Sequence, residues 1–188
     1  GPSLGEENIN SGLWSFLFAF LLVLIYMVFY YKRAGWVANI ALVANVFFII
    51  GTLASLGAAL TLPGIAGLVL TIGMSVDANV LIYERIREEL RNGKGIKLAI
   101  QDGYKHAYSA IIDANVTSLL TAVVLAYFGS GPIQGFATTL IIGVFTSLFS
   151  AIFITRLIFS YLLDTKREIY FSRKFTENLF TGTTIEFL

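Results

Sequence analysis

Apolar residues gather in five long stretches, each able to cross a lipid bilayer as a helix. The hydrocarbon core requires about 20 predominantly apolar residues in helical form. The stretches cover residues 13–31, 36–60, 62–83, 110–128 and 133–163. Hydrophobic residues make up 56% of the chain and charged residues only 13%, a balance that excludes an ordinary soluble domain. The sequence therefore predicts an all-α membrane protein, a bundle of five spanning helices.

Basic residues occupy alternate connections between these stretches. They follow the first stretch (Lys32 and Arg33), the third (residues 85–105) and the fifth (residues 166–174), and the other connections contain none. Because basic loops remain cytoplasmic, we expect an extracytoplasmic N-terminus and a cytoplasmic C-terminus. Arg156 is the exception within a stretch, and it either snorkels to the interface or pairs with a carboxylate.

This pattern divides the chain into three regions. Residues 1–12 form an extracytoplasmic stub that opens with Gly1-Pro2-Ser3, typical of a tag remnant, residues 13–163 form the bundle, and residues 164–188 form a cytoplasmic tail. In the connection 84–106, Asn92-Gly93 is expected to break the chain. Apolar residues at 96 and 98–100 then predict a short cytoplasmic amphipathic helix before Gly103.

Asp77 lies in the middle of the third stretch. A carboxylate at that depth costs roughly 3 kcal/mol on insertion scales, so an ionisable residue there indicates a functional site. The alternative is a structural pair with a neighbouring helix. Gly73 lies one turn before Asp77 and provides a small surface for helix packing. Asn79 points to the opposite side of the helix, where interhelical hydrogen bonding is the favoured interpretation.

The fourth stretch has a second intramembrane carboxylate, Asp113. Polar residues recur at intervals of three or four along one face of this helix: His106, Ser109, Asp113, Thr117 and Thr121. In a membrane such a stripe is expected to face a bundle interior or a water-lined path. The alternative is that Asp113 pairs locally and that the threonines bond to their own backbone.

The two carboxylates stand in related sequences. Val76-Asp77-Ala78-Asn79-Val80 is echoed by Ile112-Asp113-Ala114-Asn115-Val116. Asp77 precedes Arg85 by eight residues, and Asp113 follows His106 by seven, so both lie about 10–12 Å from the basic connection along their helices. We therefore expect the two motifs at similar depths on adjacent antiparallel helices, with Asn115 and Thr117 as supporting polar residues.

Several classes of chemistry have no support in the chain. Cysteine is absent and there is one histidine, so no metal site is expected. No glycine-rich phosphate loop or nucleophile elbow occurs, and the topology accounts for the basic residues, so we expect no cofactor and no nucleic-acid partner. An intramembrane aspartyl protease would also use two aspartates on adjacent helices. The surroundings of Asp113 lack the glycine-flanked pattern expected there, so a non-enzymatic role is favoured.

The combined motifs resemble the SecD family of the bacterial Sec translocase. They include Leu62-Pro63-Gly64-Ile65-Ala66-Gly67, the run from Val76-Asp77-Ala78-Asn79 to Ile86, Gln101-Asp102-Gly103-Tyr104, Asp113-Ala114-Asn115-Val116-Thr117 and Gln134-Gly135-Phe136-Ala137. The resemblance covers roughly residues 14–159. The tail, from Arg173-Lys174-Phe175 to Ile185-Glu186-Phe187-Leu188, looks like the start of a SecF half, as in fused SecDF proteins.

The resemblance implies the resistance-nodulation-division superfamily fold and a role in preprotein export across the bacterial cytoplasmic (inner) membrane, driven by a proton or sodium gradient. It implies that Asp77 is the family's intramembrane relay aspartate and that Asp113 is a second relay group. The implied partners are a SecF-like half, the SecYEG channel and the translocating preprotein. The alternatives are a small-molecule or lipid exporter of the same superfamily and a scaffold that holds a periplasmic domain at the channel.

Overall fold

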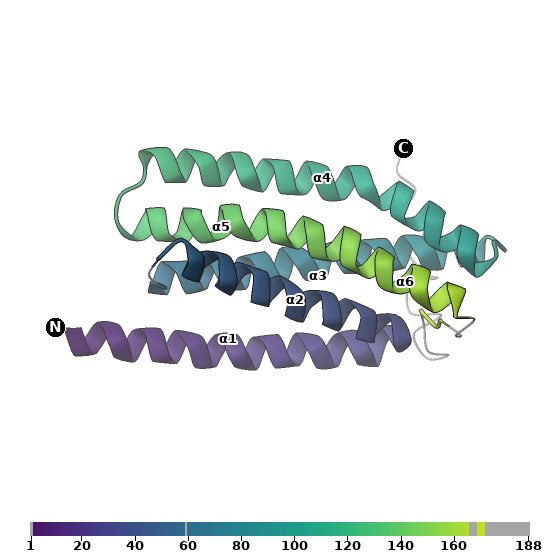
Figure 1. Ribbon diagram of the computed structural model, residues 1–188, viewed down its shortest axis with the longest axis horizontal. Coiled ribbons are helices and arrows are strands. Elements are labelled where there is room, and N and C mark those ends of the chain that lie inside the picture. The colour runs from purple at the N-terminus through teal and green to yellow at the C-terminus, as the bar shows by residue number, and fades with distance from the viewer. Residues whose placement is uncertain (1, 59, 166–168, 172–188) are drawn as a thin grey trace, which may run out of the picture.

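Five long helices, each antiparallel to the next along the chain, make up the computed structural model, which describes residues 2–58, 60–165 and 169–171. In chain order they are α1 (Pro2–Tyr31), α2 (Arg33–Ser55), α3 (Leu62–Arg91), α4 (Ile96–Phe128) and a fifth span made of α5 (Pro132–Leu148), η1 (Phe149–Ile154) and α6 (Thr155–Asp164). Figure 1 shows α1 and α4 on opposite outer sides of the bundle. All five are long and apolar enough to cross a membrane, which confirms the predicted fold class.

Several expected boundaries are wrong. The separate amphipathic helix does not form, because α4 runs unbroken from Ile96 to Phe128 through Gly103. α3 likewise continues to Arg91, so the connection between them shrinks to residues 92–95. α1 begins at Pro2, so most of the stub 1–12 extends the first helix. The SecF-like part of the tail, residues 173–188, lies outside the described residues.

The connections have local causes. At the start of α3, the Thr61 side chain accepts a hydrogen bond from Gly64 N at 3.2 Å and caps the helix. Proline occupies the first turn, where a backbone N–H would have no intrahelical acceptor, so its absence costs no hydrogen bond. The turn from α3 to α4 uses Gly93 at φ +84°, a conformation open to glycine at no steric cost. Lys32, at φ +52°, is the single residue between α1 and α2. The "basic end" denotes the end of the bundle where α1 meets α2, α3 meets α4, and α6 ends (Figure 1).

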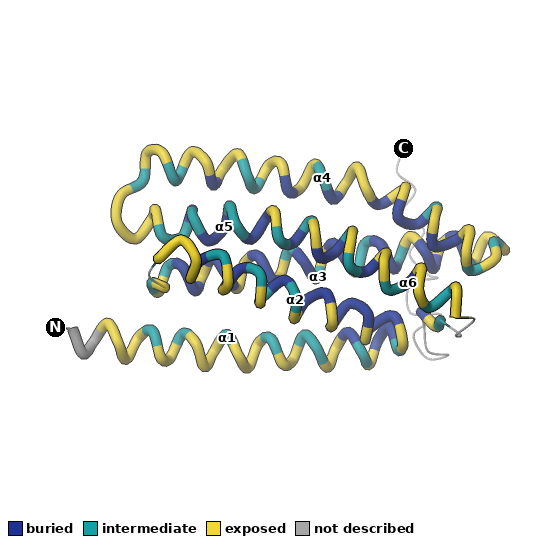
Figure 2. The backbone as a smooth tube through the Cα atoms, viewed as in Figure 1, coloured by how far each residue is buried: buried dark blue, intermediate teal, exposed yellow. Residues whose placement is uncertain are grey.

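The centre of the bundle is α3, and small residues let its neighbours approach closely. A Cβ on Gly103 of α4 would lie 2.8 Å from Ile86 N, and one on Gly67 would lie 3.0 Å from the Phe136 carbonyl oxygen of α5. In the most apolar window of each helix, 56% of residues are buried for α3 but 17% for α4 and 6% for α1. Figure 2 shows the same contrast along the outer helices. One long side of α4 is therefore uncovered.

The fifth span contains a π-helical segment, η1, that the sequence did not predict. Such segments insert an extra residue into the turn and often accompany functional sites. Here η1 is followed by Thr155, whose hydroxyl donates to the Ala151 carbonyl at 2.5 Å and also pairs with the Tyr104 hydroxyl at 2.5 Å. Both residues are buried, so this polar contact joins α4 to α6 near the basic end.

Candidate intramembrane relay site

Asp77 lies at the midpoint of α3, 15 residues after Leu62 and 14 before Arg91. Its side chain is exposed on the surface of this chain, on the same helix face as Ala66, Leu70 and Gly73. A Cβ on Gly73 would meet nothing within 4 Å. Gly64 and Gly67 pack against α5, but Gly73 faces open space, so the expected packing surface at Gly73 is not used within the described residues.

Asp113 is exposed on α4 in the same way. The whole stripe of His106, Ser109, Asp113, Thr117 and Thr121 is exposed. The Thr117 hydroxyl donates to the Asp113 carbonyl at 2.9 Å, and the Thr121 hydroxyl donates to the Thr117 carbonyl at 3.0 Å. The threonines thus bond to their own backbone, as the alternative interpretation held. No helix among the described residues covers the stripe, so the described helices do not form the bundle interior that it was expected to face, and the water-lined path remains a prediction.

The two carboxylates lie at the same level. Gly103 and Ile86 are in direct contact where α4 crosses α3, which fixes the antiparallel register. Asp77 lies nine residues from Ile86 and Asp113 ten from Gly103, both away from the basic end, so the rises are about 14 Å and about 15 Å. The expected similar depth follows directly from this contact.

The asparagines of the two motifs are buried on the opposite sides of their helices. Asn79 donates to the Ser75 carbonyl at 3.1 Å, and Asn115 donates to the Ile111 carbonyl at 2.8 Å. The expected interhelical hydrogen bond of Asn79 is not observed among the described residues, where the amide oxygen of Asn79 is buried without a partner. In both motifs the aspartate is exposed and the asparagine buried, so the sequence echo is also a structural one.

Neither Asp77 nor Asp113 has a side-chain partner among the residues that the structure describes. Within the described part of the chain, Asp77 and Asp113 make no side-chain ion pair or hydrogen bond. The same residues contain no cluster of three histidine, cysteine or acidic side chains able to hold a metal ion.

The acidic residues at the basic end are paired instead. Lys94 contacts Glu89 at 2.6 Å and Asp102 at 2.7 Å, and His106 Nδ1 lies 2.9 Å from Glu89. The hydrogen bonds from Lys94 to Asp102 and Glu89 raise the pKa of Lys94 above its ordinary 10.5. This cluster, Glu89–Lys94–Asp102–His106, ties the ends of α3 and α4 together. Sequence reasoning missed it, although the antiparallel register of the two helices could have indicated it.

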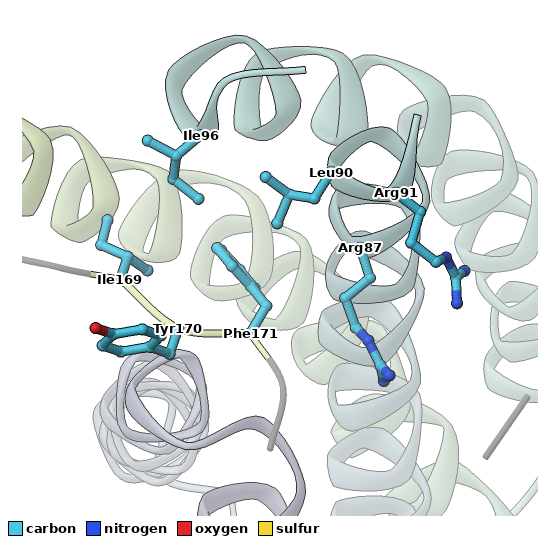
Figure 3. A pocket seen from close by; sticks show the side chains of 7 residues that line it. All are labelled: Arg87, Leu90, Arg91, Ile96, Ile169, Tyr170 and Phe171. Atoms are coloured by element: carbon cyan, nitrogen blue, oxygen red, sulfur yellow. The ribbon is translucent and has the colours of Figure 1, made fainter. Parts of the chain in front are cut away.

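A cavity of about 290 Å³ also lies at the basic end, between the last turns of α3, Ile96 and the segment 169–171 (Figure 3). The segment is anchored there, because the Tyr170 carbonyl accepts a hydrogen bond from Ala34 N at 3.2 Å and the Phe171 ring packs on Tyr83. Arg87 on its wall pairs with Glu84 at 2.8 Å. Arg87 is ten residues from Asp77, about 15 Å along α3, so this cavity is separate from the relay carboxylates.

Comparison with known proteins places this architecture. Residues 1–165 match the family described as protein export membrane protein SecD/SecF, C-terminal. Protein translocase subunit SecD of Rhodothermus marinus is 61% identical over 163 residues, which are 87% of this chain and 26% of that protein. The SecD subunit of Desulfurispirillum indicum is 55% identical over 88% of this chain and 32% of its own length.

A solved structure has the same fold. The crystal structure of SecDF, a translocon-associated membrane protein from Thermus thermophilus, superposes with a TM-score of 0.87 at 42% identity, over 93% of this chain and 24% of that one. The chain thus spans about a quarter to a third of the length of the relatives it matches. By its sequence and by its fold, the chain belongs to the SecD/SecF family of protein export membrane proteins.

Proposed function

We propose that this chain is the membrane part of a protein-export subunit in which Asp77 and Asp113 bind and release the coupling ion, a proton or a sodium ion. The observation behind the proposal is that two carboxylates without partners lie at one level, halfway along spanning helices. The names of its relatives, protein translocase subunit SecD, support export as the process.

Carboxylate chemistry supports coupling at this position. A protonated Asp77 can lie against an apolar neighbour, whereas an ionised Asp77 requires water or a cation. A change of protonation therefore favours one of two helix arrangements. Moving one charge through 100 mV is worth about 2.3 kcal/mol, enough to shift such an equilibrium about fiftyfold.

The same observations point to a partner for the uncovered surface. We define the open face as Ala66, Leu70, Gly73 and Asp77 of α3 together with the stripe His106, Ser109, Asp113, Thr117 and Thr121 of α4, all of them exposed. Polar groups at membrane depth are unfavourable against lipid, and Gly73 permits close approach of another helix. A SecF-like half, in the same chain or the same complex, is the partner that we assign to the open face.

The cellular setting follows from charge. The basic end carries Lys32, Arg33 and the charged residues between Glu84 and Lys105, and basic loops favour the cytoplasmic side. We therefore assign the N-terminus to the outside of a bacterial inner membrane and the end of α6 to the cytoplasm. The SecYEG channel and the translocating preprotein are the further partners in this proposal.

A small-molecule or lipid exporter of the resistance-nodulation-division superfamily is the alternative, since a relay carboxylate does not itself specify the cargo. The relatives at 61% and 55% identity are named as SecD, which favours preprotein. A passive scaffold is a third possibility, and ion dependence distinguishes it from a relay.

The test uses Asp77→Asn in the full-length protein, reconstituted into vesicles with the export machinery. We expect the variant to lose the part of preprotein export that an imposed proton or sodium gradient stimulates, because asparagine cannot ionise. Asp164→Asn is the matched control, a carboxylate at the exposed end of α6, and it should keep gradient-stimulated export. Wild-type stimulation in Asp77→Asn would refute the relay, and export that no gradient stimulates even in wild type would favour the scaffold.

A further inference from the structure

A second cavity, of about 360 Å³, lies between α4 and the end of the fifth span. Its floor is apolar, from Ile82, Ile111 and Ile152, and its rim is polar, from Lys105, Tyr108 and Arg156. Tyr108 is five residues from Asp113, about 140° around α4. The cavity is therefore on a different flank of α4 from the open face.

The two cations on the rim make no close ion pair with an acid of the described residues, although Lys105 interacts electrostatically with Asp102 over a longer distance. Within the described residues, neither Lys105 nor Arg156 makes an ion pair or a hydrogen bond, and no carboxylate lines the cavity. Arg156 lies inside the fifth span, eight residues before its end at Asp164, or about 12 Å along the helix. An unpaired arginine at that depth is unfavourable unless its guanidinium reaches the interface or meets an anion.

Contacts between α6 and α4 position Arg156 at the rim of the cavity. Arg156 follows Thr155, whose hydroxyl pairs with that of Tyr104 on α4. Tyr104 also lines the cavity and interacts electrostatically with Arg156. The π-helical segment η1 ends immediately before this pair. The backbone of α6 is thus joined to α4 directly behind the cavity, which keeps Arg156 close to Lys105.

The depth and chemistry of the cavity match one kind of ligand. It opens near the basic end, which the charge pattern assigns to the cytoplasmic interface of the membrane. Tyr108 is 53% exposed there, as tyrosines at membrane interfaces are. A phosphate offers several acceptor oxygens to two cations, and an acyl chain can cover the isoleucines. Basic pockets between membrane helices on the cytoplasmic side bind anionic headgroups.

We propose that this cavity binds an anionic phospholipid, with the phosphate between Lys105 and Arg156 and an acyl chain over Ile82, Ile111 and Ile152. The site is independent of the ion relay, since it uses neither Asp77 nor Asp113.

The experiment counts lipids retained by the purified, delipidated chain in detergent by native mass spectrometry, with phosphatidylglycerol and phosphatidylcholine titrated separately. Each cation near the phosphate is worth about fivefold in affinity. We expect Arg156→Gln and Lys105→Gln each to weaken phosphatidylglycerol binding about fivefold and to leave phosphatidylcholine binding unchanged. Arg156→Lys should retain most of the affinity because it keeps the charge.

Lys97→Gln is the matched control, an exposed lysine in the first turn of α4 outside the cavity, and it should bind phosphatidylglycerol as wild type does. Equal binding by wild type, Arg156→Gln and Lys105→Gln would overturn the site. A second measurement adds inorganic phosphate at millimolar concentration as a competitor. Retention of the lipid supports a lipid site. Full displacement of the lipid would overturn the lipid assignment in favour of a free-anion site. Helical content by circular dichroism separates lost binding from misfolding. Because Lys105 is exposed, its variant is decisive even if Arg156→Gln misfolds.

Discussion

The pair of helices α3 and α4 has two contrasting regions. At the basic end they are in close contact, and the acids Glu89 and Asp102 are bonded to Lys94, with His106 also on Glu89. About 14 Å further along, at the level of Asp77 and Asp113, both side chains face outward and neither has a partner among the described residues. Carboxylates of one helix pair are thus neutralised at one level and left available at another.

The difference between the two regions supports the proposed position of the ion relay. A carboxylate held by a lysine and a histidine is already satisfied, so adding a proton would break existing bonds. A carboxylate without partners gains from protonation when lipid or an apolar helix covers it. The paired end keeps α3 and α4 in register, and in the proposed relay it is the level of Asp77 and Asp113 at which protonation changes what packs against the two helices.

The largest expected effect comes from glycine substitutions in the two regions. Gly103→Ala places a methyl group against Ile86, where the contact would be 2.8 Å from the backbone nitrogen, and should destabilise the chain by about 1–3 kcal/mol through overpacking. Gly73→Ala enters open space and should be neutral or stabilising by up to ~1 kcal/mol through helix propensity. Thermal unfolding in detergent, followed by circular dichroism, measures both. Equal destabilisation would show that the two levels are packed alike.

A smaller contrast is expected between the acids themselves. Glu89→Gln removes the charge that holds Lys94 and His106, so the unfolding temperature should fall. Asp77→Asn removes no bond made within the described residues, so the unfolding temperature should stay the same or rise. The same unfolding measurement, at neutral pH and low salt, compares the two variants directly. A fall in Asp77→Asn as large as that in Glu89→Gln would mean that Asp77 has a structural partner.

The sequence was sufficient for the five spans because their signal is local: each is long and apolar, with few charges. It failed at Gly103, which was expected to follow a helix end because glycine weakens helices. The structure keeps Gly103 helical because the backbone of Ile86 lies where a larger side chain would be. A tertiary contact of this kind has no trace in local propensity.

The candidate site was predicted only in part, because the sequence shows local periodicity but not tertiary contacts. Helical periodicity was enough to place Asp77 opposite Asn79 and to align the stripe through Asp113. It was not enough to give the direction of either face, since that depends on which helices pack against them. It also favoured an interhelical bond for Asn79, whereas the structure shows the Asn79 amide donating to the Ser75 carbonyl of its own helix.

The smallest expected effect concerns alkaline pH and the paired region. The bonds to Asp102 and Glu89 raise the pKa of Lys94 above 10.5, so the folded state holds this proton more tightly than the unfolded state does. The stabilisation is therefore fully present below pH 10.5 and is lost as the pH rises above it. Between about pH 9 and 12, the range in which lysines titrate, the unfolding temperature of Lys94→Gln should fall less steeply with pH than that of wild type. Lys97 is an exposed lysine on the same helix pair, so Lys97→Gln is the control for the other titrating groups. Its unfolding temperature should fall with pH as steeply as that of wild type. If Lys94→Gln and Lys97→Gln gave the same slope, Lys94 would not link α3 to α4, and the contrast between a closed basic end and an open level at Asp77 would rest on packing alone.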